Sequence, residues 1–171
     1  MDNKDLYSNC IKKKPILDEK QVFLYFLQIL NGIEFLHNLK ICHRDIKPDN
    51  ILFNGDKLKI ADFSLAENTK NKLKGSCGTP GFLSPEVFYS ENYTEKVDIF
   101  SLGVVLYMML KIHINKNKFK IRLTGIPVFK GKTSEEVLKK NKQCKINFKN
   151  KAFVLLSKSG LIISPDFYEF K

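Results

Sequence analysis

The sequence predicts a mainly helical fold with one small β-hairpin. Two long segments, 19–39 and about 94–110, carry apolar residues at helical spacing, and the second is apolar all round, as in a central buried helix. Between them, the string ILFNGDKLKI has two short apolar runs around Asn54 and Gly55, a pair typical of tight hairpin turns. With 171 residues, 43% of them hydrophobic, the chain is long enough to bury one core.

Capping residues mark the predicted starts of helices. Asp18 is placed to cap the first helix, and Ser84, followed by proline and glutamate, marks a later start. Thr133 and Glu136 form a capping box ahead of a further helix. Residues 61–80 are polar and lack periodicity, so we expect a long loop there, of the kind that compact domains tend to keep for function.

The charge of the chain raises the question of nucleic-acid binding. The formal net charge is +11, but the excess is almost all lysine, since the only arginines are Arg44 and Arg122. Lysine attracts phosphate without the bidentate recognition of bases that arginine provides, and these lysines are spread along the chain. We therefore expect a solvated surface and no specific nucleic-acid partner, with a basic RNA-binding module as a third alternative function.

The four cysteines, Cys10, Cys42, Cys77 and Cys144, show neither a CxxC pair nor metal-ligand spacing. Reduced thiols in an intracellular protein, cytoplasmic or nuclear, are the simplest interpretation. The most apolar run, Ile99–Leu110, is shorter than the ~20 residues that a membrane span needs, and the N-terminus does not resemble a signal peptide. We therefore expect no membrane span.

The strings HRDIKPDN and ADFS hold the residue types that phosphoryl transfer requires. That reaction needs a carboxylate to orient the attacking hydroxyl, a cation near the transferred phosphate, hard oxygen ligands for magnesium, and exclusion of water. Asp45 can be the carboxylate and Lys47 the cation, while Asn50 and Asp62 offer oxygens to a metal. The hairpin between the two strings would act as a rigid spacer that returns Asp62 towards Asn50.

Together with two further strings, these resemble one known family. HRDIKPDN, DFS, CGTPGFLSPE and DIFSLG follow one another in the order of the catalytic loop, magnesium loop, activation-segment end and central helix of the eukaryotic protein kinases. The resemblance covers about residues 1–110 and 124–148, and it implies the C-terminal (large) lobe of the kinase α+β fold. Lys47, two residues after Asp45, resembles the lysine of the serine/threonine kinases. The strings GTPGF and GIPVFKGKTSEEVLKK resemble those of the calcium/calmodulin-dependent group.

The resemblance implies transfer of the γ-phosphate of ATP to serine or threonine hydroxyls of proteins, with ATP and Mg²⁺ as cofactors. Asp45 would be the catalytic carboxylate, Lys47 would contact the γ-phosphate, and Thr79 would bond both. Asn50 and Asp62 would hold magnesium. Leu52 would pack under adenine, which completes a nucleotide-binding set of Lys47, Asn50, Leu52 and Asp62.

Asp49 is similar to the acidic residue that, in basophilic kinases, faces an arginine of the substrate. This would favour protein substrates with basic residues near the phosphorylated hydroxyl. A solvated charge beside Lys47 is the alternative interpretation.

The resemblance assigns structural support to His43, Arg44, Phe63, Glu86 and Asp98. His43 and Phe63 would pack in the core, and Asp98 would brace the backbone of the HRD string by hydrogen bonds. Gly75 stands where many relatives carry a phosphorylated threonine, so Arg44 lacks its expected phosphate partner. Glu86 would pair with a family arginine further downstream, and none follows Arg122.

The chain also departs from the family pattern. No glycine-rich loop and no strand lysine of the VAIK type precede His43, so we expect the N-terminal lobe to be absent. Ser64 replaces the usual glycine of the magnesium loop, with a loss of backbone freedom. Residues 111–123 interrupt the family pattern, and we expect an insertion there, either a basic surface loop or translated intron. The partial kinase domain would span 1–148, and 149–171 would be a divergent tail with part of a further helix.

These features predict a protein serine/threonine kinase that is present as a fragment and inactive alone, because the groups that grip the phosphates from above are missing. The alternative is a pseudokinase or regulatory fragment that binds kinase substrates or partners without turnover.

Overall fold

The computed structural model describes residues 5–12, 16–17, 19–109, 112–115, 118–122 and 127–146. The predicted cap Asp18 and the tail 149–171 lie outside these residues. The elements follow in this order: a π-helical turn Tyr7–Lys12, β1 Ile16–Leu17, α1 Glu19–Asn38, β2 Ile41–Cys42, a 3₁₀ turn Pro48–Asn50, β3 Ile51–Asn54, β4 Lys57–Ile60, β5 Glu67–Asn68, α2 Glu86–Tyr89, α3 Lys96–Met109, β6 Ile112–Asn115, β7 Lys118–Arg122 and α4 Ser134–Gln143.

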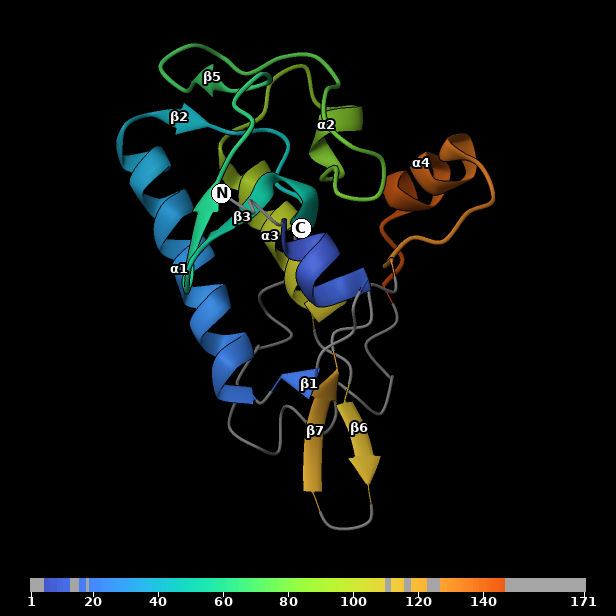
Figure 1. Cartoon of the computed structure of the whole chain (residues 1–171). Helices are drawn as coiled ribbons and strands as arrows, with labels where there is room; N and C mark the ends of the chain where they lie inside the picture. The colour runs from blue at the N-terminus through green and yellow to red at the C-terminus, as the bar shows by residue number, and fades with distance from the viewer. Residues whose placement is uncertain are drawn as a thin grey trace.

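Helices α1 and α3 form the centre of the fold (Figure 1), as predicted from their apolar spacing. Apolar residues of α1, such as Ile29 and Ile33, are buried together with Leu102, Val105 and Met109 of α3. Ten of the fourteen residues of α3 are buried, which agrees with its all-round hydrophobicity. The loop that contains HRDIKPDN is anchored in the same core through Ile46, which is fully buried.

The predicted hairpin is formed by β3 and β4, which pair antiparallel and pack on α1. The backbone N–H of Leu58 donates to Oε1 of Gln28 on α1 at 2.8 Å. The turn lies one residue further along the chain than predicted, because Asn54 pairs with Lys57 as the closing pair of the ladder. Of the predicted pair, only Gly55 takes a positive φ, of 61°.

Two further small antiparallel sheets were not predicted. β2 pairs with β5 inside the long loop 61–80, and β6 and β7 form a hairpin that carries β1 at its outer edge. β6 and β7 lie within the predicted insertion 111–123 and extend away at the end opposite β2 and β5 (Figure 1). Apolar residues alternate along both strands, and the register pairs isoleucines with Ile121 and Phe119, so the period-2 pattern accounts for a hairpin where a loop was expected.

The predicted helix starts have mixed outcomes. Thr133 caps α4 and accepts a hydrogen bond from the Glu136 N–H at 3.2 Å, as the capping box predicts. The helix start predicted at Ser84 is confirmed, since α2 begins at Glu86, but Ser84 does not cap it: α2 has no side-chain cap, and the buried Ser84 hydroxyl has no hydrogen-bond partner among the described residues. Pro85 already has helical dihedral angles, so the chain enters α2 without a side-chain cap. No helix in the described part of the chain is long and apolar enough to cross a membrane.

Cys42 is expected to resist alkylation in the folded protein. The side chain is fully buried in β2, and burial, followed by the charge of Asp98, raises the pKa of the thiol far above its usual value. Because the thiolate is the reactive form, iodoacetamide at mildly alkaline pH should modify Cys42 only after unfolding in urea. Peptide mass spectrometry would follow the labelling, with the half-buried Cys77 as the internal comparison. Equal labelling of Cys42 in the folded and unfolded protein would contradict this packing.

Candidate active site

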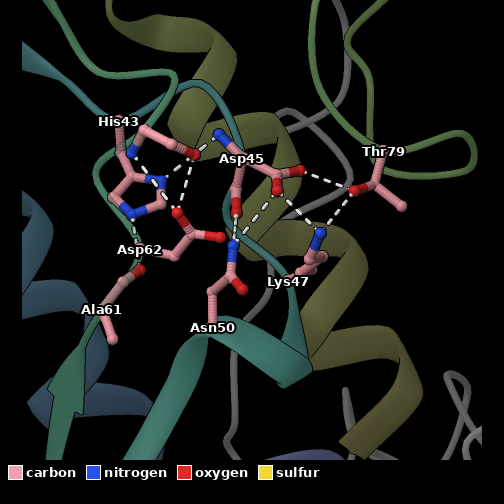
Figure 2. Close-up of polar contacts among 8 residues, drawn as sticks. His43, Asp45, Lys47, Asn50, Ala61, Asp62 and Thr79 are labelled. Atoms are coloured by element: carbon pink, nitrogen blue, oxygen red, sulfur yellow. Dashed lines mark hydrogen bonds and ion pairs between the residues drawn. The ribbon is translucent and has the colours of Figure 1, made fainter.

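Asp45, Lys47 and Thr79 form a closed triangle of polar contacts (Figure 2). The Lys47 ammonium donates to Asp45 Oδ2 at 2.7 Å and to Thr79 Oγ1 at 2.8 Å, and the Thr79 hydroxyl donates to Asp45 Oδ1 at 2.7 Å. Asp45 is 8% exposed, so the carboxylate is buried, and both of its oxygens are oriented by a partner. The structure thus brings together the three residues to which the sequence analysis assigned the chemistry, across 34 residues of chain.

Asn50 adds a third contact to the Asp45 carboxylate. It ends the 3₁₀ turn Pro48–Asn50 and is buried. Its amide nitrogen donates to the backbone oxygen of Asp45 at 2.9 Å and to Asp45 Oδ2 at 3.1 Å. Because both contacts use the nitrogen, the amide oxygen of Asn50 is not committed to Asp45.

Asp62 follows the hairpin that begins at Asn50. The Ala61 N–H donates to the backbone oxygen of Asn50 at 2.9 Å, so the two ends of the hairpin are tied together directly beside Asp62. Asp62 is exposed, and its φ of 62° turns the chain at the end of β4. The Ser64 hydroxyl donates to Asp62 Oδ1 at 2.7 Å and the Ser64 N–H at 3.3 Å, and these bonds hold the pKa of the Asp62 carboxyl below its usual value.

Ser64 was expected to restrict the backbone where the family has glycine. The left-handed conformation falls on Asp62 instead, so Ser64 needs no positive φ. Its two hydrogen bonds to Asp62 give it a part in fixing the proposed metal ligand. The string DFS alone carried no signal for this contact.

Asp98 of α3 holds the backbone just before Asp45. Its Oδ2 accepts from the His43 N–H and its Oδ1 from the Arg44 N–H, both at 2.8 Å, and Asp98 itself is 1% exposed. Arg44 has a φ of 66°, so this carboxylate stabilises a residue in a sparsely populated conformation. His37 Nε2 lies 2.9 Å from Asp98 Oδ2, a third contact that the sequence analysis missed.

The Arg44 guanidinium contacts oxygens of the loop 61–80 and of Tyr93. Nε donates to the Leu65 backbone oxygen at 2.6 Å, and NH2 lies 3.7 Å from a carboxylate oxygen of Glu67. The Tyr93 hydroxyl is 3.5 Å from NH1 and donates to the Gly75 backbone oxygen at 2.8 Å. Tyr93 was not predicted, because its partners lie sixteen and more residues away and the local sequence carries no signal for them.

The remaining predicted residues lie further from the triangle. Asp49 is exposed and Leu52 is half-buried on β3. Glu86 is half-buried at the start of α2, where its charge, after burial, contributes to a raised pKa of the Cys144 thiol. His43 is fully buried, and its Nε2 lies 3.0 Å from the Ala61 backbone oxygen (Figure 2).

The prediction that Phe63 packs in the core is wrong for the described residues. Its ring meets the His43 ring edge to face, with centroids 5.0 Å apart, but the side chain is 46% exposed. Only one side of Phe63 is packed, because it lies at the open side of an apolar groove between α1 and the β3–β4 hairpin. Phe35 of α1 lines the same groove and is 64% exposed.

Several known proteins contain sequences similar to this one. The protein kinase domain model matches residues 1–159. The chain is 42% identical to rhodopsin kinase GRK1 of Rattus norvegicus over 106 residues, which are 60% of this chain and 19% of that protein. It is 34% identical over 171 residues to the probable serine/threonine-protein kinase HSL1 of Saccharomyces cerevisiae, over 97% of this chain and 10% of that protein. It is 49% identical over 92 residues to the serine/threonine-protein kinase chk-2 of Caenorhabditis elegans, over 49% of this chain and 19% of that protein.

The chain therefore spans at most about a fifth of the length of these relatives. The matched region nevertheless includes every residue of the Asp45 triangle and of the hairpin beside it. With the family model covering most of its residues, and with serine/threonine kinases as its relatives, the chain belongs to the protein kinase family.

Proposed function

We propose that this chain supplies the catalytic groups of a protein kinase that transfers the γ-phosphoryl group of ATP to serine or threonine hydroxyls of protein substrates, and that the chain alone is inactive. The observation that supports this best is the buried Asp45 carboxylate, whose two oxygens are held by Lys47, Asn50 and Thr79. A carboxylate accepts up to about four hydrogen bonds, and these partners make three. A position is therefore left for an incoming hydroxyl group.

Each residue of the triangle has its own proposed role in the transfer of the phosphoryl group. Asp45 orients the substrate hydroxyl and takes its proton as the bond from the hydroxyl oxygen to the γ-phosphorus forms and the bond to the leaving oxygen of ADP breaks. Lys47 neutralises charge on the transferred group. Thr79 holds the Asp45 carboxylate and the Lys47 ammonium in place through its hydrogen bonds to both. Positioning and electrostatics account for most of the catalysis in this reaction class.

Asn50 and Asp62 fit a magnesium ion by their chemistry. Magnesium prefers hard oxygen ligands and is bound through one or two protein groups together with waters and substrate phosphates. The pair offers one amide oxygen and one carboxylate whose pKa is lowered, at the two ends of one hairpin. Asn50 and Asp62 would hold the ion, which would supply positive charge against the phosphate groups of the nucleotide. The described residues contain no cluster of three or more His, Cys, Asp or Glu side chains suited to a metal, so phosphate oxygens and water would supply the other ligands.

The substrates that we propose are proteins with basic residues near the phosphorylated hydroxyl. Asp49 is exposed and lies within the same turn as Asn50, so its charge is accessible to a substrate peptide. We also infer an intracellular setting, cytoplasmic or nuclear, because ATP is the phosphate donor and the described cysteines Cys42, Cys77 and Cys144 are unpaired.

Phosphorylation of a basic serine peptide with magnesium and ATP, by the purified chain and by a longer in-frame product of the locus, would test this function. We expect Asp62→Ala to remove the activity by weakening metal binding, and added magnesium to restore part of it. Asp56→Ala is the matched control, because Asp56 is an exposed carboxylate in the turn of the same hairpin. Activity of the longer product that is the same with and without Asp62→Ala would refute the proposed role of Asp62.

A regulatory kinase-like module without turnover is the second candidate. We propose that the chain corresponds to the large lobe, and full-length transcript sequencing through this locus would test its extent. An in-frame small lobe upstream would favour the enzyme. A chain that binds substrate peptides but transfers no phosphate in any form of the transcript would favour the regulatory module.

A further inference from the structure

Asn141 is a fully buried polar residue on α4 that contacts the end of the activation segment. Its exposed fraction is 0%. The amide oxygen accepts from the Gly81 N–H at 2.9 Å, and the amide nitrogen donates to the Leu83 backbone oxygen at 2.5 Å. These partners lie 60 and 58 residues away in the sequence. A single side chain therefore satisfies one donor and one acceptor of an irregular segment.

The segment depends on such outside partners because it is neither helix nor strand. Gly81 and Leu83 are buried, and Gly81 has a φ of 95°, which only glycine adopts readily. On the other side, the Ser101 hydroxyl of α3 donates to the Phe82 backbone oxygen at 2.7 Å. Without Asn141, the Gly81 N–H and the Leu83 oxygen would be buried and unpaired, which is costly.

The same segment begins at Thr79, a member of the catalytic triangle. The Phe82 N–H donates to the Thr79 backbone oxygen at 3.1 Å, so residues 79–82 form one hydrogen-bonded turn. The Thr79 side chain at the start of that turn contacts both Asp45 and Lys47. A shift of the turn away from α4 would therefore move the Thr79 hydroxyl relative to the carboxylate.

We propose that Asn141 is a positioning residue for phosphoryl transfer. Asn141 holds the turn 79–83 in place, so that the Thr79 hydroxyl keeps its hydrogen bonds to Asp45 and Lys47. This inference rests on the proposed function and extends it to a helix outside the catalytic strings. It also gives α4 a role in the reaction, since any partner that displaces α4 would act on the catalytic triangle.

The competing explanation is that Asn141 only helps α4 to dock. The two can be separated with a matched pair of variants. Asn141→Leu keeps the number and branching of the side-chain heavy atoms and removes both hydrogen bonds, whereas Thr133→Ala removes the cap of α4, whose hydrogen bond is to Glu136 and not to the turn 79–83. Asn141→Asp is the second variant in case the leucine variant does not fold, because it keeps an acceptor for the Gly81 N–H and loses the donor to Leu83.

Two measurements on the full chain carry the test. The first is peptide phosphorylation, with kcat and the KM for ATP determined separately well below the melting temperature. We expect the Asn141 variants to lower kcat by about tenfold or more, with the KM for ATP changed by less than about twofold and with Thr133→Ala near the unmodified chain. Equal kcat values in the folded Asn141 and Thr133 variants would overturn the proposal.

The second measurement is amide hydrogen exchange read by mass spectrometry, which requires no turnover. We expect Asn141 variants to speed exchange in the peptides that cover 79–83 and also 43–50, and Thr133→Ala to speed it only in α4. Faster exchange confined to α4 would overturn the proposal. If the unmodified chain alone transfers no phosphate, as its sequence predicts, the second measurement still decides whether Asn141 holds the catalytic triangle, and the first is repeated on a longer in-frame product of the locus, where a lack of transfer would refute the proposed function.

Discussion

Asp45→Asn is expected to lower kcat for peptide phosphorylation by about a thousandfold. The substitution keeps the shape of the side chain but removes the negative charge that accepts the proton of the hydroxyl. It also disturbs the triangle, because the new amide group offers a donor towards the Lys47 ammonium or the Thr79 hydroxyl, both of which now donate to Asp45. The loss should therefore combine a missing base with a misplaced cation.

Steady-state kinetics with a basic serine peptide at saturating ATP would measure this loss. Asp56→Asn serves as the control, because it makes the same chemical change at an exposed hairpin turn. Circular dichroism would establish that both variants are folded. A kcat of Asp45→Asn within a few-fold of the unmodified chain would show that another group takes the proton.

Asp98→Ala is expected to destabilise the fold by about 3 kcal/mol and to lower the melting temperature by roughly 10 °C. The carboxylate is 1% exposed and accepts hydrogen bonds from two backbone N–H groups, those of His43 and Arg44. Its removal leaves both groups buried without their acceptor, and it releases Arg44 from a φ of 66°. His37 would lose its 2.9 Å contact with the same oxygen.

Thermal and urea unfolding of Asp98→Ala and Glu91→Ala would test this expectation. Glu91 is an exposed carboxylate between α2 and α3, so its removal should change stability by less than about 0.5 kcal/mol. Asp98→Asn would retain one acceptor and should lie between the two. If Asp98→Ala and Glu91→Ala unfold alike, the bonds to the HRD backbone contribute little to stability.

Local patterns predicted the elements that position the site. The spacing of apolar residues in α1 and α3 required no information from elsewhere in the chain, and both helices are present within two residues of the predicted bounds that the structure describes. The hairpin was predicted from Asn54 and Gly55, although its turn lies one residue further along. The strings HRDIKPDN and DFS were recognised by their resemblance to a family. That resemblance assigned a role to each residue before its position in the structure was known.

Contacts between distant parts of the chain could not be predicted in the same way. His37 reaches Asp98 across 61 residues, and Asn141 reaches Gly81 across 60. A histidine on a helix or an asparagine near a helix end is compatible with many partners, so neither residue type carries a signal. Phe63 was wrongly placed in the core for a related reason, since the sequence shows that a ring is apolar but not how much of it is covered.

The hairpin between Asn50 and Asp62 has a consequence for the order in which the site is completed during folding. Its two ends are joined within one local unit, which closes at a small cost in chain entropy. The bond from Thr79 to Asp45 spans 34 residues, that from Asp98 to the HRD backbone 55, and that from Asn141 to Gly81 60. Contacts over such spans form later in folding and emerge later from the ribosome. The side of the site that would bind metal can therefore form first, and the geometry that we propose for transfer would be complete only when α4 has packed against residues 79–83.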